Sequence, residues 1–93
     1  MNIYPASRSV YHKIQSKHHI KWDEIKEVFK NQDEKIKIFR ASSRNDYGQK
    51  RLKALGRTFA ERYIMTVFIK EIAGLKIITA RDMTVKEKKQ YNQ

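Results

Sequence analysis

The sequence predicts an α+β fold in which N-terminal helices precede an antiparallel sheet of about four strands and a short C-terminal helix closes the chain. Three observations carry this prediction. Apolar residues recur at helical spacing near the N-terminus, strand-like alternation begins near residue 35, and a helix-capping pattern follows the last apolar run. The 93 residues suffice for a single domain over residues 1–93, and we expect residues 1–8 to form a flexible leader.

Two helices are expected in the N-terminal part of the chain. The first covers residues 9–17, where Val10 and Ile14 share one face. The second covers residues 22–29, where apolar side chains recur at helical spacing. Two acidic residues near its start favour the positive end of the helix dipole.

The middle of the chain matches strands. Residues 35–39 begin with alternating polar and apolar side chains, and turn formers over residues 42–48 separate them from the next strand. Three further strands follow over residues 51–57, 63–70 and 75–81, and their short connections imply antiparallel neighbours. The last two strands carry apolar side chains at both odd and even positions, so both faces of the sheet should be covered. We expect helices on one face and a helix, substrate or partner on the other.

A C-terminal helix is expected to start at Thr84. Thr84 and Glu87 have the capping-box spacing, in which the hydroxyl and the carboxylate each accept a hydrogen bond from an exposed amide. The helix would end near Tyr91, and a helix this short must dock on the domain to persist. The Tyr91 ring is expected to pack and anchor the helix; the alternatives are that it stacks on a nucleobase as an RNA-binding residue or acts as an acid.

The composition is strongly basic. Lysine and arginine number 21 against 10 acidic residues, and the net charge of +11 favours polyanions. We expect nucleic acid or an acidic protein partner; a solvated lysine-rich surface and anionic lipid are the alternatives. The chain has no cysteine for disulfides or thiolate metal sites, and no apolar stretch long enough to span a bilayer. A soluble, cytoplasmic protein without a membrane role is expected.

Four segments of the second half share their order and spacing with one known family. They are a strand that opens with arginine and ends in Gly-Arg-Thr, an apolar strand, a strand ending in Thr-Ala-Arg, and a helix with glutamate and tyrosine, at residues 51–58, 63–69, 77–81 and 87–91. Upstream, Lys17-His18-His19-Ile20 is similar to the family's lysine-histidine turn before its helix. The chain thereby resembles the BrnT family of toxin ribonucleases over about residues 17–92.

This resemblance implies a RelE-like fold and a ribonuclease activity that stops translation. It also implies neutralisation by a cognate antitoxin, usually a BrnA-like ribbon-helix-helix protein, so that operator DNA is contacted only through the antitoxin. The chain departs from the family pattern at two places. Lys76 stands where an arginine is usual, and Gln49-Lys50 stands where the family tends to carry an acid just before the arginine matched by Arg51.

RNA cleavage without a metal needs a base for the 2′-hydroxyl proton, cationic donors for the phosphate, and an acid for the leaving oxygen. Arg57 and Arg81 each end a predicted strand, where a planar guanidinium can present paired donors to phosphate oxygens. We predict that both stabilise the transition state. The alternative is that they are surface arginines or pair with Glu61 or Asp82.

The histidines His12, His18 and His19 lie in one basic segment, and histidine is the natural proton shuttle near neutral pH. We predict that His18 or His19 acts as acid or base, with simple RNA contact as the alternative. Lys17 beside them is predicted to bind RNA. Because there is no cysteine and no carboxylate before Asp23, we expect no zinc site, no other metal and no cofactor.

Arg51 and Lys53 share strand parity with Arg57, which predicts an RNA-binding cationic row on one face; solvated charges are the alternative. Gly56 is expected to relieve crowding near a strand end rather than to cradle phosphate. The favoured function is a metal-independent toxin ribonuclease. The alternatives are a noncatalytic RNA-binding module or inactive toxin relative, and an interaction protein for an acidic partner.

Overall fold

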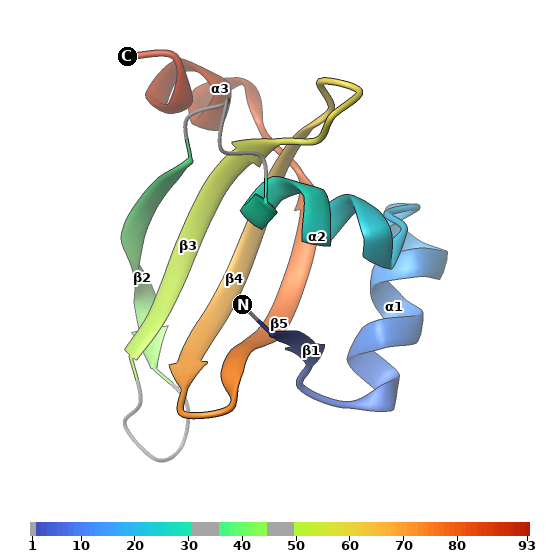
Figure 1. The fold of residues 1–93 in the computed structure, drawn as a ribbon. Coiled ribbons are helices and arrows are strands. Elements are labelled where there is room, and N and C mark those ends of the chain that lie inside the picture. The colour runs from blue at the N-terminus through green and yellow to red at the C-terminus, as the bar shows by residue number, and fades with distance from the viewer. Residues whose placement is uncertain (1, 31–35, 45–49) are drawn as a thin grey trace.

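The structure, a computed structural model, describes residues 2–30, 36–44 and 50–93. Within these residues a sheet carries two helices on one side and a third helix at one end (Figure 1). The predicted α+β class is confirmed, with both N-terminal helices and the C-terminal helix in place. The elements in chain order are β1 (Ile3–Pro5), α1 (Arg8–His18), α2 (Trp22–Lys30), β2 (Lys37–Arg44), β3 (Lys50–Arg57), β4 (Tyr63–Glu71), β5 (Gly74–Asp82) and α3 (Val85–Tyr91).

Among the described residues, the sheet has five strands in the order β1-β5-β4-β3-β2. Strands β2 to β5 pair antiparallel, as predicted, whereas β1 runs parallel to β5 through the pairs Ile3↔Leu75 and Pro5↔Ile77. The prediction of about four antiparallel strands is therefore wrong in detail, because the segment expected as a leader supplies a fifth, parallel strand. Three residues ending in proline are too few to show strand alternation, which is why the pattern missed β1.

Strand β2 is longer than predicted. It extends to Arg44, so residues 42–44, expected in a loop, belong to a strand. The pairing of β2 with β3 shifts register between Arg40 and Arg44, which is how a strand accommodates turn-forming residues. The rest of the predicted loop, residues 45–48, lies outside the described residues, as does Lys35 at the start of the first predicted strand.

Helices α1 and α2 cover one face of the sheet (Figure 1). Their side chains Ile14, Ile25 and Val28 are almost fully buried against Phe68 and Ile77 of the central strands. Burial of such side chains supplies most of the stability of short helices like these. None of the helices in the described part of the chain is long and apolar enough to cross a membrane.

Two glycines permit close approaches of the backbone. A Cβ atom on Gly56 would lie 2.7 Å from Val28 Cγ1, so glycine lets α2 pack tightly on β3, in agreement with the predicted relief of crowding. Gly74 opens β5 with a φ of +143°, and a Cβ atom there would lie 2.2 Å from the Asn2 carbonyl oxygen. The N–H of Leu75 donates to that oxygen at 2.8 Å, so Gly74 allows β1 to join the sheet.

The opposite face of the sheet is only partly covered. Helix α3 begins with the predicted capping box: the Thr84 hydroxyl accepts from the Glu87 N–H, and the Glu87 carboxylate accepts from the Thr84 N–H. The helix lies across one end of this face, where a second apolar cluster forms from Leu55, Met65, Met83 and Tyr91. Among the described residues, no other helix covers this face.

Candidate functional site

A pocket of about 390 Å³ opens on the uncovered face of the sheet. Its apolar floor comes from β4 and β5 and consists of Met65, Val67 and Ile78. Its charged wall comes from β2, β3, β5 and α3 and consists of Arg40, Arg51, Lys53, Arg81 and Glu87.

The strand register explains why these side chains meet. Alternate residues of a strand point to the same side, so Arg51 and Lys53 both face the pocket from β3. Lys53 pairs with Val67 of β4, and Met65 of β4 pairs with Arg81 of β5. Cations of β3 and β5 therefore flank apolar side chains of the strand between them.

An ion pair between Arg81 and Glu87 forms one side of the charged wall. Arg81 donates from Nη1 to Glu87 Oε1 at 2.8 Å and from Nη2 to Oε2 at 3.1 Å. Oε1 also accepts the Thr84 N–H at 2.9 Å, and Lys53 Nζ lies 3.8 Å from Oε2. Burial acts to raise the pKa of Glu87, but the hydrogen bonds and the nearby cations outweigh it and lower the pKa below the ordinary 4.5. The carboxylate is therefore ionised at neutral pH.

The pocket as a whole is positively charged. Among the described residues that line it, four cations face a single carboxylate, that of Glu87. The buried Nε of Arg51 has no hydrogen-bond partner among the described residues. Phosphate oxygens are acceptors that suit such donors. In the described part of the chain, acidic and histidine side chains do not gather in groups of three that would hold a metal ion.

Arg57 shares this face of β3 but lies toward α3, outside the pocket lining. Its guanidinium carbon is 5.5 Å from the ring centre of Tyr63 and 6.0 Å from that of Tyr91, within cation–π range. Its Nη1 is 3.7 Å from Glu61, one of the partners considered from the sequence. Tyr91 is 5% exposed and meets the Tyr63 ring edge-on at 5.8 Å, so it occupies the packing position.

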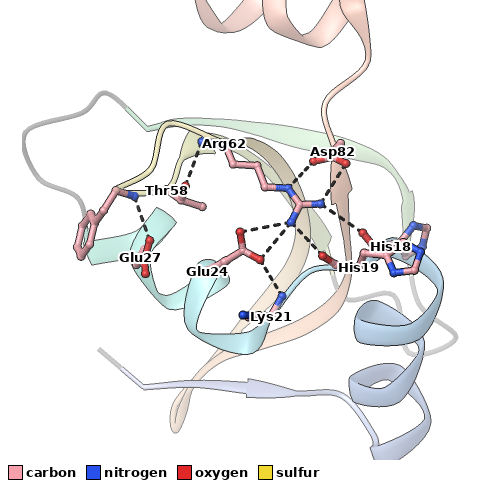
Figure 2. Close-up of polar contacts among 9 residues, drawn as sticks. His18, His19, Lys21, Glu24, Glu27, Thr58, Arg62 and Asp82 are labelled. Carbon is pink, nitrogen blue, oxygen red and sulfur yellow. Dashed lines mark hydrogen bonds and ion pairs between the residues drawn. The ribbon is translucent and has the colours of Figure 1, made fainter.

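Hydrogen bonds from Arg62 connect the N-terminal helices to the end of β5 (Figure 2). Its guanidinium binds both carboxylate oxygens of Asp82, at 2.8 and 3.1 Å, and Glu24 of α2 at 3.1 Å. It also donates to the carbonyl oxygens of His18 and His19, at 3.4 and 2.9 Å. These carbonyls belong to the end of α1, where backbone acceptors lack helical partners. The hydrogen bonds to Asp82 raise the pKa of Arg62 and lower that of Asp82.

The predicted proton-transfer residues lie at the end of α1. Figure 2 shows the imidazoles of His18 and His19 directed away from Arg62, which contacts only their carbonyls. His18 is half-buried, whereas His19 and Lys17 are exposed. None of these three side chains lines the pocket.

The surroundings of His18 affect its protonation. Burial lowers its pKa below 6.5, and the charges of Lys17, Lys13 and Arg81 lower it further, against the opposing effect of Asp82. The imidazole is therefore neutral at neutral pH, which is the form that accepts a proton. Arg81 belongs to the pocket wall, so its charge couples the pKa of His18 to the pocket.

Part of the predicted site comes together in the pocket, namely Arg51, Lys53 and Arg81. The other predicted residues lie elsewhere, at the end of α1, in α3 or beside α3; they are Lys17, His18, His19, Arg57 and Tyr91. Sequence reasoning missed Arg40 and Glu87 of the pocket wall, and it missed Arg62. Glu87 had a usable signal, because its capping box directly follows the strand that ends near Arg81.

Comparison with protein-family models gives a match over residues 11–87 to the ribonuclease toxin BrnT of type II toxin-antitoxin systems. The match includes every residue that lines the pocket, whereas β1 and the last residues of α3 lie outside it. Comparison with curated proteins finds no match. Because the family match covers most of the chain, the protein belongs to the BrnT family of ribonuclease toxins.

Proposed function

We propose that this BrnT-family chain cleaves RNA without a metal ion, on the open face of its sheet. The observation that carries the proposal is the pocket in which Arg51, Lys53 and Arg81 surround an apolar floor. Guanidinium groups present paired donors that match phosphodiester oxygens, and the net charge of +11 draws RNA to the surface. The apolar floor then offers a surface for the attached nucleoside.

In the proposed reaction the 2′-oxygen of one nucleotide attacks the adjacent phosphorus, and the bond from phosphorus to the next 5′-oxygen breaks. A base accepts the 2′-hydroxyl proton, and an acid donates a proton to the leaving 5′-oxygen. The products carry a 2′,3′-cyclic phosphate and a 5′-hydroxyl. Arg81 stabilises the charge that develops on the phosphate oxygens, and Arg57 is the second proposed donor.

His18 or His19 is the proposed proton-transfer residue. The lowered pKa of His18 supports a role as base, since its imidazole is neutral at neutral pH. Both histidines lie outside the pocket lining, so the RNA strand has to extend from the pocket toward the end of α1 to meet either. Lys17, in the last turn of that helix, would bind a phosphate of the same strand.

A type II toxin family implies an antitoxin partner and an RNA target. We propose that the partner is a BrnA-like ribbon-helix-helix protein and that it neutralises the toxin by binding its positive surface. Operator DNA would then be contacted through the antitoxin. The net charge of +11 and the mostly cationic pocket wall support binding through an acidic surface of the partner.

The test is cleavage of RNA by purified protein in excess chelator, with Arg81→Ala and Lys86→Ala compared alongside. Loss of one transition-state donor costs about 10² to 10³ in rate, and we expect that loss for Arg81→Ala. Lys86 is exposed on α3 and does not line the pocket, so Lys86→Ala removes the same charge without removing a donor. Its cleavage rate should stay close to that of the wild type.

Both variants are first shown to unfold cooperatively. Equal rate losses in the two would mean that only overall charge matters and would remove Arg81 from the site. Cleavage that stops in chelator would contradict the proposed metal independence.

A noncatalytic RNA-binding role is the second candidate, because one feature of the family pattern is missing. Lys50 is exposed at the start of β3, where the family tends to carry an acid, and Gln49 lies outside the described residues. RNA binding by the folded wild type without any cleavage would favour this candidate over the ribonuclease.

A further inference from the structure

Glu87 is the only carboxylate among the described residues that line the pocket, and it joins two elements. In the first turn of α3 it accepts the Thr84 N–H and so caps that helix. With both oxygens it also holds the guanidinium of Arg81 at the end of β5. Its side chain is 9% exposed, so water competes little for these hydrogen bonds.

The hydrogen bonds of Arg81 show which edge of its guanidinium remains for a ligand. A guanidinium has an N–H on Nε and a pair of them on each terminal nitrogen. Arg81 uses Nη1 and Nη2 on Glu87, and it uses Nη1 again on the Asp82 carbonyl at 3.1 Å. The Nε–H and the second Nη2–H have no partner among the described residues. These two donors lie on one edge and form the fork that binds two oxygens of one phosphate.

We propose that Glu87 is a positioning residue of the RNA site: it fixes Arg81 so that the Nε–Nη2 edge meets the phosphate, while its own charge weakens RNA binding. The effect on cleavage rests on the proposed ribonuclease function, whereas the effect on binding does not. Without the two hydrogen bonds to Glu87, the long side chain of Arg81 samples many rotamers, and its Nε–H and Nη2–H are no longer preorganised for phosphate. With Glu87 in place, a phosphate that approaches Lys53 and Arg81 comes close to the ionised carboxylate of Glu87, which repels it.

These two effects predict that Glu87→Gln changes RNA binding and RNA cleavage in opposite directions. The glutamine keeps the shape and an oxygen for the Thr84 N–H, but it removes the charge and replaces one acceptor for Arg81 with a donor. RNA should bind about two- to tenfold more tightly, because a charge that repels phosphate is gone. Cleavage at saturating RNA should be about tenfold slower or more, because Arg81 is no longer oriented. A residue that only supports the fold would weaken both together.

The experiment measures binding and cleavage separately in the wild type, Glu87→Gln and Thr84→Ala. Binding is followed by fluorescence anisotropy with an oligodeoxynucleotide, which lacks the attacking 2′-hydroxyl; cleavage is followed by single-turnover kinetics with the matching RNA. Thr84→Ala is the matched control, because it removes the other half of the capping box and leaves the Arg81–Glu87 pair. It should lower the melting temperature, while binding and rate stay near wild-type values.

A third readout does not depend on cleavage. The NMR signals of the Arg81 Nη–H groups that donate to Glu87 should be resolved and slow to exchange in the wild type, and should move toward those of free arginine in Glu87→Gln. An unchanged signal, or weaker DNA binding by Glu87→Gln, would overturn the inference. If the wild type does not cleave RNA, the proposed function fails, and the binding and NMR results still decide the role of Glu87.

Arg81→Lys tests the same geometry if Glu87→Gln does not fold. Lysine keeps the charge but has no fork, so binding of the oligodeoxynucleotide should persist while cleavage falls by about tenfold or more. Cleavage at the wild-type rate in Arg81→Lys would overturn the inference, because it would show that the orientation of a guanidinium is not needed.

Discussion

At the scale of single residues, the neighbours of each arginine decide what it does. Arg81 binds Glu87 at the pocket wall, and Arg62 binds Asp82 next to the ends of α1 and α2. Arg57 lies within cation–π range of two tyrosine rings. Position at a strand end, within the family-like motifs, made Arg57 and Arg81 candidates. It was not enough to tell which of them lines a pocket, because that depends on which side chains α3 covers.

The pKa of His18 should lie below the ordinary 6.5 of histidine, since burial first and the nearby cations second disfavour the protonated imidazole. Arg81→Ala should raise the midpoint, because one of those cations is removed, and Asp82→Asn should lower it, because the opposing charge is lost. An NMR titration of the imidazole Cε1–H in the three proteins measures these shifts. A midpoint that Arg81→Ala leaves unchanged would show that His18 and the pocket wall are not electrostatically coupled.

At the scale of elements, the patterns predicted those segments whose signal lies within their own residues. Strand-like alternation predicted the first part of β2, and the Thr84 to Glu87 spacing predicted the start of α3. Strand β1 lacks such a signal, because its three residues are held by pairing with β5 at the other end of the chain. The register shift beside Val67, which decides which residues of β5 face the pocket, has no local signature either.

The contact between α2 and β3 leads to a prediction for Gly56→Ala. The new Cβ would lie 2.7 Å from Val28 Cγ1, so α2 has to move and the free energy of unfolding should fall by about 1–3 kcal/mol. Urea unfolding measures the change. In a Val28→Ala background the overlapping methyl group is absent, so the same substitution should cost less. Equal costs in both backgrounds would contradict the overlap as the cause.

At the scale of the whole molecule, the candidate site depends on elements far apart in the sequence. Strand parity correctly grouped Arg51 and Lys53 on one face of β3, and the basic composition predicted a positive surface. Arg40 and Glu87 come from β2 and α3, and no local pattern shows that these elements border the same pocket. The tertiary arrangement supplies that information.

Acid should destabilise the whole molecule through two ion pairs. Although burial acts the other way, the Arg81 hydrogen bonds lower the pKa of Glu87 below 4.5; the Arg62 hydrogen bonds lower that of Asp82 below 3.8. Such carboxylates stabilise the fold above their unfolded pKa, and this contribution is lost as pH falls through the folded pKa. The free energy of unfolding should therefore begin to decrease near pH 4.5 and decrease further below pH 3.8.

Urea titrations at a series of acidic pH values measure this dependence. Glu87→Gln and Asp82→Asn should each make it shallower, since each removes a carboxylate that must be protonated. If neither substitution changes the slope, the acid response comes from other groups and the prediction fails.

Helices α1 and α2 cover one face of the sheet, and the pocket opens on the other face. The two sides of the molecule can therefore meet different partners. RNA can approach the charged wall from one direction, while the helical layer is accessible from the other. A protein that held the chain only by α1 and α2 would leave the pocket open to RNA. A partner that closes the pocket itself has to reach β2, the open face or α3, so binding at the helical layer and closure of the pocket are distinguished by the direction of approach.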